Sequence, residues 1–200
     1  MTEPRTGTET EAETPTTSLH ELAALGSDAL ELLAHLTLEA SRQHAPGWLP
    51  DLAAARELIS DALVGGPQFA RVALDDSDEL VGWIAAHHDW GRIWELHPLI
   101  VSVDHQRRGH GRRMVREIER LAAAEGALTM ALSTSDLTRA TSLAGADLYR
   151  DPLDQLAGIE LRAPHPVGFW RRIGYQIVGV TPDAEGPGLP SIHLARRIAP

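Results

Sequence analysis

The chain has 200 residues, of which 43% are hydrophobic, and this suits one domain with a sizeable core. It contains no cysteine, which excludes disulfides, a thiol nucleophile and cysteine-ligated metals. The net charge of −10 argues against a general nucleic-acid binder and is compatible with a cationic partner. We find no signal peptide and no apolar run long enough to span a membrane, so we expect a cytoplasmic protein without a membrane partner.

The start of the chain differs in composition from the rest. Residues 1–17 are rich in Thr, Glu and Pro and lack an apolar pattern, which is typical of a disordered acidic tail. We expect residues 18–200 to form a single domain. Over 18–63, Leu and Ala recur at three- and four-residue spacings, which predicts helices, with Pro50 and Asp51 opening the second one.

After a Gly-Gly-Pro turn, the pattern changes to short runs rich in β-branched and aromatic residues, as expected of antiparallel strands. Three such runs precede an amphipathic helix, a strand, a stretch of weak periodicity, a short helix and two last strands. Their ranges are 69–75, 80–89, 92–103, 111–125, 127–134, 135–164, 165–174, 175–183 and 191–198. This order predicts a single domain of the α/β or α+β class.

The helix predicted at 111–125 has a clear apolar stripe, which we expect to face the core. On its other face, Arg113 can pair with Glu117, and Arg116 with Glu119. The stripe consists of Met114, Val115, Ile118, Leu121 and Ala122.

The turn before this helix combines two glycines with a cluster of arginines. Gly109 and Gly111 let the backbone approach a ligand closely, and the N–H groups that open a helix attract anions. Met114 stands where a dinucleotide fingerprint needs its third glycine, and the P-loop pattern is also absent. The turn therefore predicts a phosphate cradle of another kind. Its arginines, suited to phosphate, are Arg107, Arg108, Arg112 and Arg113.

The pattern Q/R-x-x-G-x-G/A, between a strand ending in LIVSV and an amphipathic helix, resembles the acetyl-CoA motif of the GCN5-related N-acetyltransferases (GNAT). The resemblance implies a GNAT fold of the α/β (α+β) class, with a mostly antiparallel twisted sheet, one splayed strand pair and flanking helices. It also implies acetyl-CoA as co-substrate, with the pyrophosphate on the cradle, the pantetheine arm along the preceding strand, and a backbone N–H near Ile100 or Val101 polarising the thioester. The cofactor residues so implied are Leu99, Ile100, Val101, Gln106, Arg107, Arg108, Gly109, His110, Gly111, Arg112 and Trp170.

Acetyl transfer to an amine needs a base, and the preceding strand offers two candidates. Strand alternation puts Glu95, His97, Leu99 and Val101 on one face, together with the implied thioester. Several members of the family carry their base at the position of Glu95, and His97 lies one pleat nearer the thioester. The alternatives are that Glu95 only binds the substrate ammonium and that His97 is a structural histidine.

The chain departs from the family at the position of the general acid. The family usually has a tyrosine where this chain has Trp170, whose indole is a poor proton donor to a thiolate. Tyr149 is one substitute candidate, and help from solvent or backbone is the alternative. Tyr175 is expected to open a strand. Phe169 and Trp170 are expected to pack on the pantetheine end or in the core.

From Trp94 to Ile198 the chain resembles aminoglycoside 6'-N-acetyltransferases, notably in WELHPLIV, TSLAG and HPVGFWRRIGYQIVG. The resemblance implies a small cationic amine as acceptor, with the 6'-amine of an aminoglycoside as its most specific form. Polycations favour acidic clefts, and we expect Glu95, Asp136 and Asp147 to bind this substrate. The alternative is that these aspartates only solvate loops.

Two other functions stay open. One is acetylation of another amine, such as a polyamine, an amino sugar or a biosynthetic metabolite. The other is coenzyme A binding without turnover, as in a sensor domain. We expect no metal site, because the adjacent His87 and His88 point to opposite strand faces. The last strand leaves a homodimer open.

Overall fold

A computed structural model describes residues 17–64 and 68–199, which form a seven-stranded mixed sheet flanked by helices. The strand order is β1-β2-β3-β4-β5-β7-β6, and every neighbouring pair is antiparallel except β4 and β5. The predicted α/β class and mostly antiparallel sheet are confirmed. The strands are β1 (Ser18–Glu21), β2 (Gln68–Leu74), β3 (Leu80–Trp90), β4 (Ile93–Val101), β5 (Thr129–Ser135), β6 (Gln176–Thr181) and β7 (Ser191–Arg197).

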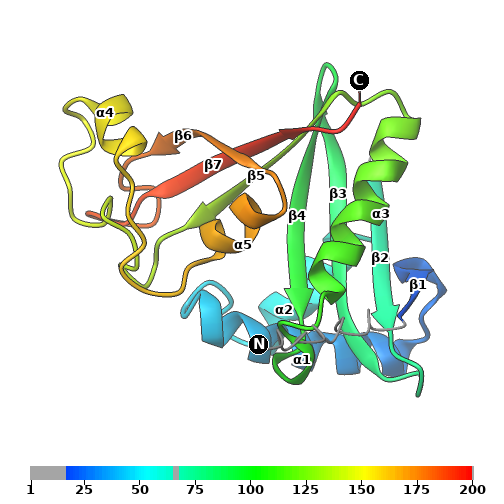
Figure 1. Cartoon of the computed structure of the whole chain (residues 1–200). Helices are drawn as coiled ribbons and strands as arrows, with labels where there is room; N and C mark the ends of the chain where they lie inside the picture. Colours follow the sequence, from blue (N-terminus) through cyan, green and yellow to red (C-terminus); the bar gives the residue numbers. More distant parts are fainter. Residues whose placement is uncertain (1–16, 65–67, 200) are drawn as a thin grey trace, which may run out of the picture.

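Helices cover both faces of the β2–β4 part of the sheet (Figure 1). Helix α3 (His110–Ala124) lies on one face, and α1 (Ser27–His44) and α2 (Leu52–Asp61) lie on the other. None of the described helices is both long and apolar enough to cross a membrane. The shorter helices are η1 (Leu22–Ala24), η2 (Val103–His105), α4 (Pro152–Ala157) and α5 (Pro166–Arg172).

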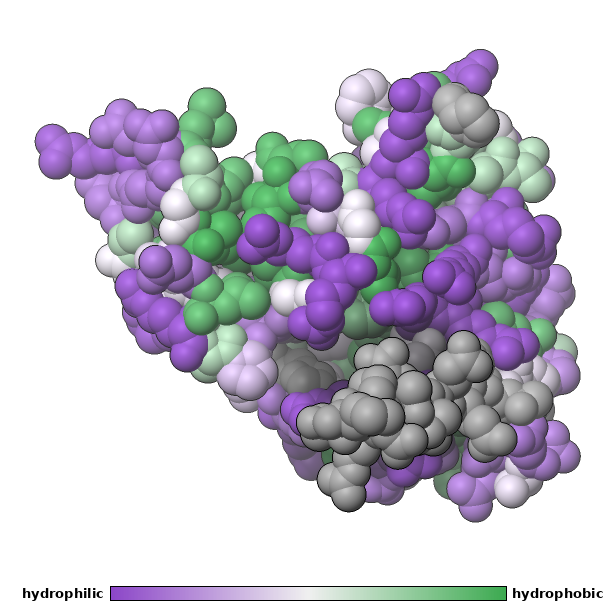
Figure 2. Space-filling model, in the orientation of Figure 1, coloured by the Kyte–Doolittle hydropathy of each residue, from purple (hydrophilic) through white to green (hydrophobic). Residues whose placement is uncertain are grey.

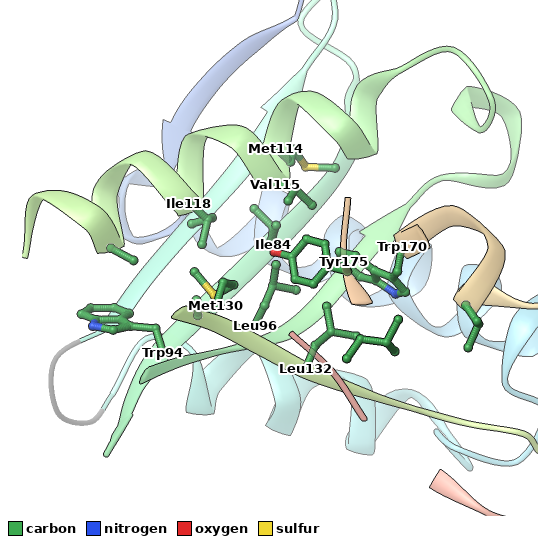
Figure 3. Close-up of a cluster of buried hydrophobic side chains, with 14 of the residues drawn as sticks. Ile84, Trp94, Leu96, Met114, Val115, Ile118, Met130, Leu132, Trp170 and Tyr175 are labelled. Carbon is green, nitrogen blue, oxygen red and sulfur yellow. The ribbon is translucent and has the colours of Figure 1, made fainter. Parts of the chain in front are cut away.

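The larger core lies between α3 and the sheet. Met114, Val115 and Ile118 point from α3 toward Ile84 and Leu96 of the sheet, as the predicted apolar stripe requires (Figure 3). Each such buried side chain stabilises the fold by about 1.5–3 kcal/mol, so this stripe accounts for the docking of α3.

A second core lies under α1 and α2. Trp83 of β3 is fully buried in it, and its indole Nε1 donates to Thr37 Oγ1 of α1 at 2.8 Å. Helix α2 begins at the predicted place, because the Asp51 carboxylate accepts the backbone N–H of Ala54 at 2.9 Å. Both faces of the sheet are therefore buried where α3 opposes α1 and α2.

The start of the described chain corrects two predictions. Residues 18–24 are not helical as predicted, since Ser18–Glu21 pairs with β2 as an edge strand and a 3₁₀ turn follows. A four-residue strand is too short for a period of two to stand out against Leu and Ala. Of the predicted tail, residues 1–16 lie outside the described part, whereas Thr17 is buried and its hydroxyl lies 2.8 Å from His110 Nδ1.

The predicted splayed strand pair is β4 and β5. Their parallel pairing is limited to three residue pairs and ends at Glu95 with Ala131. Beyond this point the strands diverge, and β5 stays paired with β7 as far as Ser135 (Figure 1). The backbone edge of β4 after Glu95 therefore has no described strand partner on the β5 side, and we call the opening between the two strands the gap.

A bulge in β4 corrects the predicted strand face. Ile84 of β3 pairs with Leu99, but Ala86 pairs with Leu96, so β4 has one extra residue between these points. The extra residue reverses the alternation. Leu99 and Val101 pack with the α3 core, whereas Glu95 and His97 face the side of α1 and α2. The four residues do not share one face.

Candidate active site

The turn before α3 has the geometry of an anion site. Gly109 is the N-cap of α3 with φ 93°, a left-handed conformation that glycine adopts without penalty. Among the described residues, the backbone N–H groups of 107–112 donate no hydrogen bond to protein. Six donors at the positive end of a helix can thus bind a diphosphate. We call residues 106–112 the cradle.

Side chains around the cradle divide into two groups. Arg107, Arg108 and Arg112 are exposed and form no ion pair with described residues. His110, in contrast, is 3% exposed, and its ring meets Thr17 rather than solvent. Burial, followed by the nearby His105 and Arg108 charges, lowers the pKa of His110. Its ring therefore supports the turn from below, and only its backbone is available to an anion.

The cradle is tied to β4 and to α5. The Gln106 amide donates to the Val101 carbonyl at 3.2 Å. Phe169 of α5 packs against Gly111, where an added Cβ would lie 3.4 Å from the Phe169 ring and 3.6 Å from Val101. Both distances are ordinary van der Waals contacts, so the cradle backbone at Gly111 packs directly against α5 and β4.

On the opposite face of β4, a carboxylate lies between two imidazoles. Glu95 Oε2 is 3.7 Å from Nε2 of its cross-strand neighbour His87. His97 lies farther along β4, with its ring edge-on to Trp48 at 5.7 Å. Desolvation lowers the pKa of His97, partly offset by the Glu95 charge. The imidazole is therefore neutral at pH 7 and able to accept a proton.

Asp136 does not reach the surface, which corrects its prediction as a substrate ligand. Its side chain is fully buried directly after β5. The carboxylate accepts the N–H groups of Ala140 and Thr141 at 2.7 and 2.8 Å, and the Thr141 hydroxyl at 2.7 Å. His165 Nε2 lies 3.9 Å away on another side. The charge thus organises its own loop.

Two other predicted residues lie on the loop before α4, which packs near β6, the sheet edge beyond β5 and β7. Tyr149 is 73% exposed, and no hydrogen bond or ring contact among the described residues joins it to β4 or β5. Asp147 is exposed, and its carboxylate accepts the Tyr149 N–H at 3.3 Å. The described contacts of Tyr149 thus give its phenol no link to the gap, and its role as general acid stays a prediction.

Trp170 takes the core position, one of the two alternatives predicted for it, and its contact with the cofactor stays a prediction. The side chain is 6% exposed and packs edge-to-face on Phe169, with ring centroids 5.0 Å apart. It also packs edge-to-face on Tyr175, at 5.1 Å (Figure 3). Phe169 is only partly buried and is the aromatic residue that borders the cradle. Tyr175 was predicted to open a strand, and β6 begins one residue later, at Gln176.

A buried ionic network beside this core was not predicted. The Tyr175 hydroxyl donates to Glu119 at 3.0 Å, and Arg196 donates to both Glu119 oxygens at 3.2 Å. Burial is the main reason that the pKa values of Glu119 and Tyr175 are raised. The predicted surface pair of Glu119 with Arg116 does not form. The only hint in the sequence was a glutamate beside the apolar stripe of α3.

Comparison with known proteins supports this geometry. Residues 31–150 match the acetyltransferase (GNAT) family. The chain belongs to this family. It therefore uses acetyl-CoA as co-substrate in N-acetyl transfer, and the splayed sheet is its GNAT fold. No curated protein sequence matches the chain.

Three solved structures are similar over nearly the whole chain. An aminoglycoside 6'-N-acetyltransferase complexed with coenzyme A is 33% identical, with 92% of this chain and 98% of that chain covered and a TM-score of 0.81. The aminoglycoside 6'-N-acetyltransferase from Enterococcus faecium is also 33% identical, with the same coverage and a TM-score of 0.78. Aminoglycoside 6'-acetyltransferase type Ii is 28% identical, covered to 92% and 98%, with a TM-score of 0.62.

Proposed function

We propose that this N-acetyltransferase acetylates the 6'-amine of an aminoglycoside. The observation that carries the proposal is the 33% identity with two aminoglycoside 6'-N-acetyltransferases over 98% of their length. The gap adds support, because it has an anion cradle on one face of the sheet and the Glu95 carboxylate on the other. The cytoplasmic location and the homodimer stay predictions.

In this proposal, coenzyme A approaches from the α3 face. The backbone N–H groups of 107–112 bind the pyrophosphate, and Arg107 and Arg108 add charge. The pantetheine arm runs along the free edge of β4, as a peptide adds to a sheet edge. The Ser102 N–H bonds to Val81 of β3 at 2.8 Å. Because successive amides alternate in direction, the N–H groups of Leu99 and Val101 point to the gap, and that of Ile100 does not.

One of these two amides is placed to polarise the thioester carbonyl. The neutral amine then attacks the carbonyl carbon, a C–N bond forms and the C–S bond breaks. The leaving thiolate takes its proton from solvent, because the indole of Trp170 is not an acid of useful strength and lies in the core. This assignment leaves Tyr149 without a role in the chemistry.

The amine approaches from the face of α1 and α2, where Glu95 removes its proton. An aminoglycoside arrives as an ammonium ion, which the Glu95 carboxylate attracts and can deprotonate directly or through water. His87 Nε2 of β3 lies 3.7 Å from this carboxylate. The neutral His97 imidazole, two residues farther along β4, is a second possible acceptor for a proton from the amine.

The test measures thiol release from acetyl-CoA by the full chain with kanamycin, tobramycin, spermidine, glucosamine or a lysine peptide. We expect fast release only with aminoglycosides that carry a 6'-amine, and none with 6'-hydroxy analogues. Glu95→Gln should lower kcat/KM by about 100-fold or more, the usual contribution of a general base. Glu57→Gln is the control, because it removes the same charge from the exposed face of α2.

Other outcomes point elsewhere. Faster release with spermidine or glucosamine would make the acceptor another amine and overturn the aminoglycoside proposal. Activity of Glu95→Gln equal to that of Glu57→Gln would remove Glu95 from proton transfer. Tight acetyl-CoA binding without release for any amine would favour a binding domain.

A further inference from the structure

A small pocket between α3 and α5 is lined mainly by guanidinium groups. Its volume is about 180 Å³, and besides Val115 and Ile173 its lining consists of four arginines. Hydrophilic side chains gather on the face of the molecule where α3 and α5 approach each other (Figure 2). The four arginines come from three elements, α3, the end of α5 and β7, and are Arg112, Arg116, Arg172 and Arg196.

The positive charge of this pocket is largely uncompensated. Arg196 is neutralised by Glu119, at 3.2 Å, and is further held by the Ile173 carbonyl at 3.0 Å. Arg112, Arg116 and Arg172 have no ion pair with any described residue. No carboxylate lines the pocket. Arg116 also acts on Glu119 through its charge, but without an ion pair, and Glu119 is already paired with Arg196. The remaining positive charges around the pocket repel one another, and an anion between them would lower that cost.

The position of the pocket relative to the cradle suggests which anion this is. Arg112 is the last residue of the cradle, in the first turn of α3, and Arg116 lies about one turn, or about 6 Å, farther along the helix. Besides its pyrophosphate, coenzyme A carries a 3'-phosphomonoester, which one ribose separates from the pyrophosphate. A space of about 180 Å³ admits a phosphate group with water but not the whole adenosine.

We propose that Arg112, Arg116 and Arg172 form a separate subsite for the 3'-phosphate of coenzyme A. Arg196, which is paired with Glu119, also lines this subsite. The inference rests on acetyl-CoA as the co-substrate but not on the identity of the acceptor amine. The dianionic phosphomonoester would lie between the α3 and α5 guanidinium groups, each of which can donate two hydrogen bonds to it. The subsite would thereby link α5 to α3 whenever the cofactor is bound.

The test compares the affinities of coenzyme A and 3'-dephospho-coenzyme A by calorimetry at one fixed salt concentration. The full chain should prefer coenzyme A by about tenfold, the effect of one well-formed charge-assisted contact. Arg172→Gln and Arg116→Gln should each reduce the preference to about twofold without weakening 3'-dephospho-coenzyme A. Arg171→Gln is the matched control, since Arg171 is also in the last turn of α5 but does not line the pocket.

The two ligands separate failure of this inference from failure of the proposed function. Equal affinities in the unmodified chain, or a preference that Arg172→Gln and Arg171→Gln reduce alike, would overturn the subsite while leaving acetyl transfer intact. Loss of both ligands in Arg172→Gln would also count against it, because 3'-dephospho-coenzyme A binding reports an intact cradle. If the unmodified chain bound neither ligand, the proposed function and this inference would both fall.

Discussion

The segments that follow β4 and β5 differ in how their exposed backbone N–H groups are satisfied. Both leave a strand and turn sharply, and both expose backbone N–H groups in doing so. After β4, the N–H groups of 107–112 have no acceptor within the described protein. After β5, the N–H groups of Ala140 and Thr141 are taken by the buried carboxylate of Asp136.

The first loop is thus built for an external anion, and the second carries an anion of its own. After β4, the free N–H groups are surrounded by basic residues and glycine. After β5, the N–H groups of Ala140 and Thr141 are bound by Asp136, which precedes them by four and five residues. Only the first loop can gain stability from a phosphate ligand. The two loops therefore differ because a carboxylate lies close enough to accept the N–H groups after β5, and none among the described residues does so after β4.

Of the variants that test this difference between the two loops, Asp136→Ala should have the largest effect, a loss of stability. Its carboxylate accepts three hydrogen bonds in a site closed to water, so its loss leaves buried donors unsatisfied. We expect the free energy of unfolding to fall by about 3 kcal/mol, measured by urea denaturation. Asp147→Ala, at an exposed position, should change it by less than about 0.5 kcal/mol.

A different result would reverse the roles of the two aspartates. If Asp136→Ala kept its stability but lost affinity for the acceptor amine, the carboxylate would be a substrate ligand, as its place after β5 indicates in the sequence. The two variants together therefore distinguish a charge that organises a loop from one that meets solvent.

Asp136 also shows where prediction from sequence stops. The elements were predicted well where one periodic pattern determines burial, as in the α3 stripe around Ile118. The cradle was predicted because its signal is local, within Gly109 and its neighbours. Asp136 has the same local sequence whether its carboxylate points outward or inward. Its direction depends on how the loop closes around it.

Two further errors share a long-range cause. The face of Glu95 was predicted together with that of Val101, because the extra β4 residue shows only in the register with β3. Glu119 was predicted to pair along its own helix, yet its partners Tyr175 and Arg196 lie 56 and 77 positions away in the sequence. Tertiary pairing decides both, and no local pattern contains it.

The next effect in size is that of Gly109→Ala on the loop after β4. A Cβ at φ 93° strains the turn by about 1 kcal/mol and tilts the N–H groups of the cradle. We expect the Kd for acetyl-CoA to rise about tenfold in calorimetry. Gly126→Ala is a matched control, because Gly126 has φ 87° at the other end of α3 with open space around it.

Both variants should lose similar stability, and only Gly109→Ala should lose affinity. Equal Kd values for the two would show that the free N–H groups after β4 do not bind the cofactor, and the contrast between the two loops would then disappear.

A smaller effect concerns pH and the loop after β5. His165 caps α5 through Nδ1, which accepts the Val167 N–H at 3.3 Å, and this requires the neutral ring. Burial lowers the pKa of His165, only partly opposed by Asp136 and the Ser135 carbonyl. Around and below pH 6.5 the imidazole therefore binds more protons in the unfolded chain than in the folded one. The free energy of unfolding consequently decreases as the pH is lowered.

We expect His165 to contribute about 1 kcal/mol of this loss between pH 7 and pH 5. His165→Asn keeps a capping oxygen but does not titrate, so urea denaturation across this range should give a shallower slope. His20→Asn, which removes an exposed imidazole from β1, serves as control. A His165→Asn slope as steep as that of the unmodified chain would contradict the assignment of the neutral ring to the cap.

Tyr149→Phe should have the smallest effect on activity. It tests whether the proton of the leaving thiol comes from a side chain near the β6 edge of the sheet. The phenol is 73% exposed on the loop before α4 and has no described contact with the gap. Removal of its hydroxyl should leave kcat within about twofold, since only interactions made in the transition state alter the chemical step. Steady-state thiol release with the best acceptor, beside Glu95→Gln, provides the measurement. A loss approaching that of Glu95→Gln would mean that this loop moves onto the gap during turnover and that Tyr149 protonates the thiolate. A kcat close to that of the unmodified chain would leave solvent as the proton source and confine the proton-transferring side chains to the β3–β4 side of the gap.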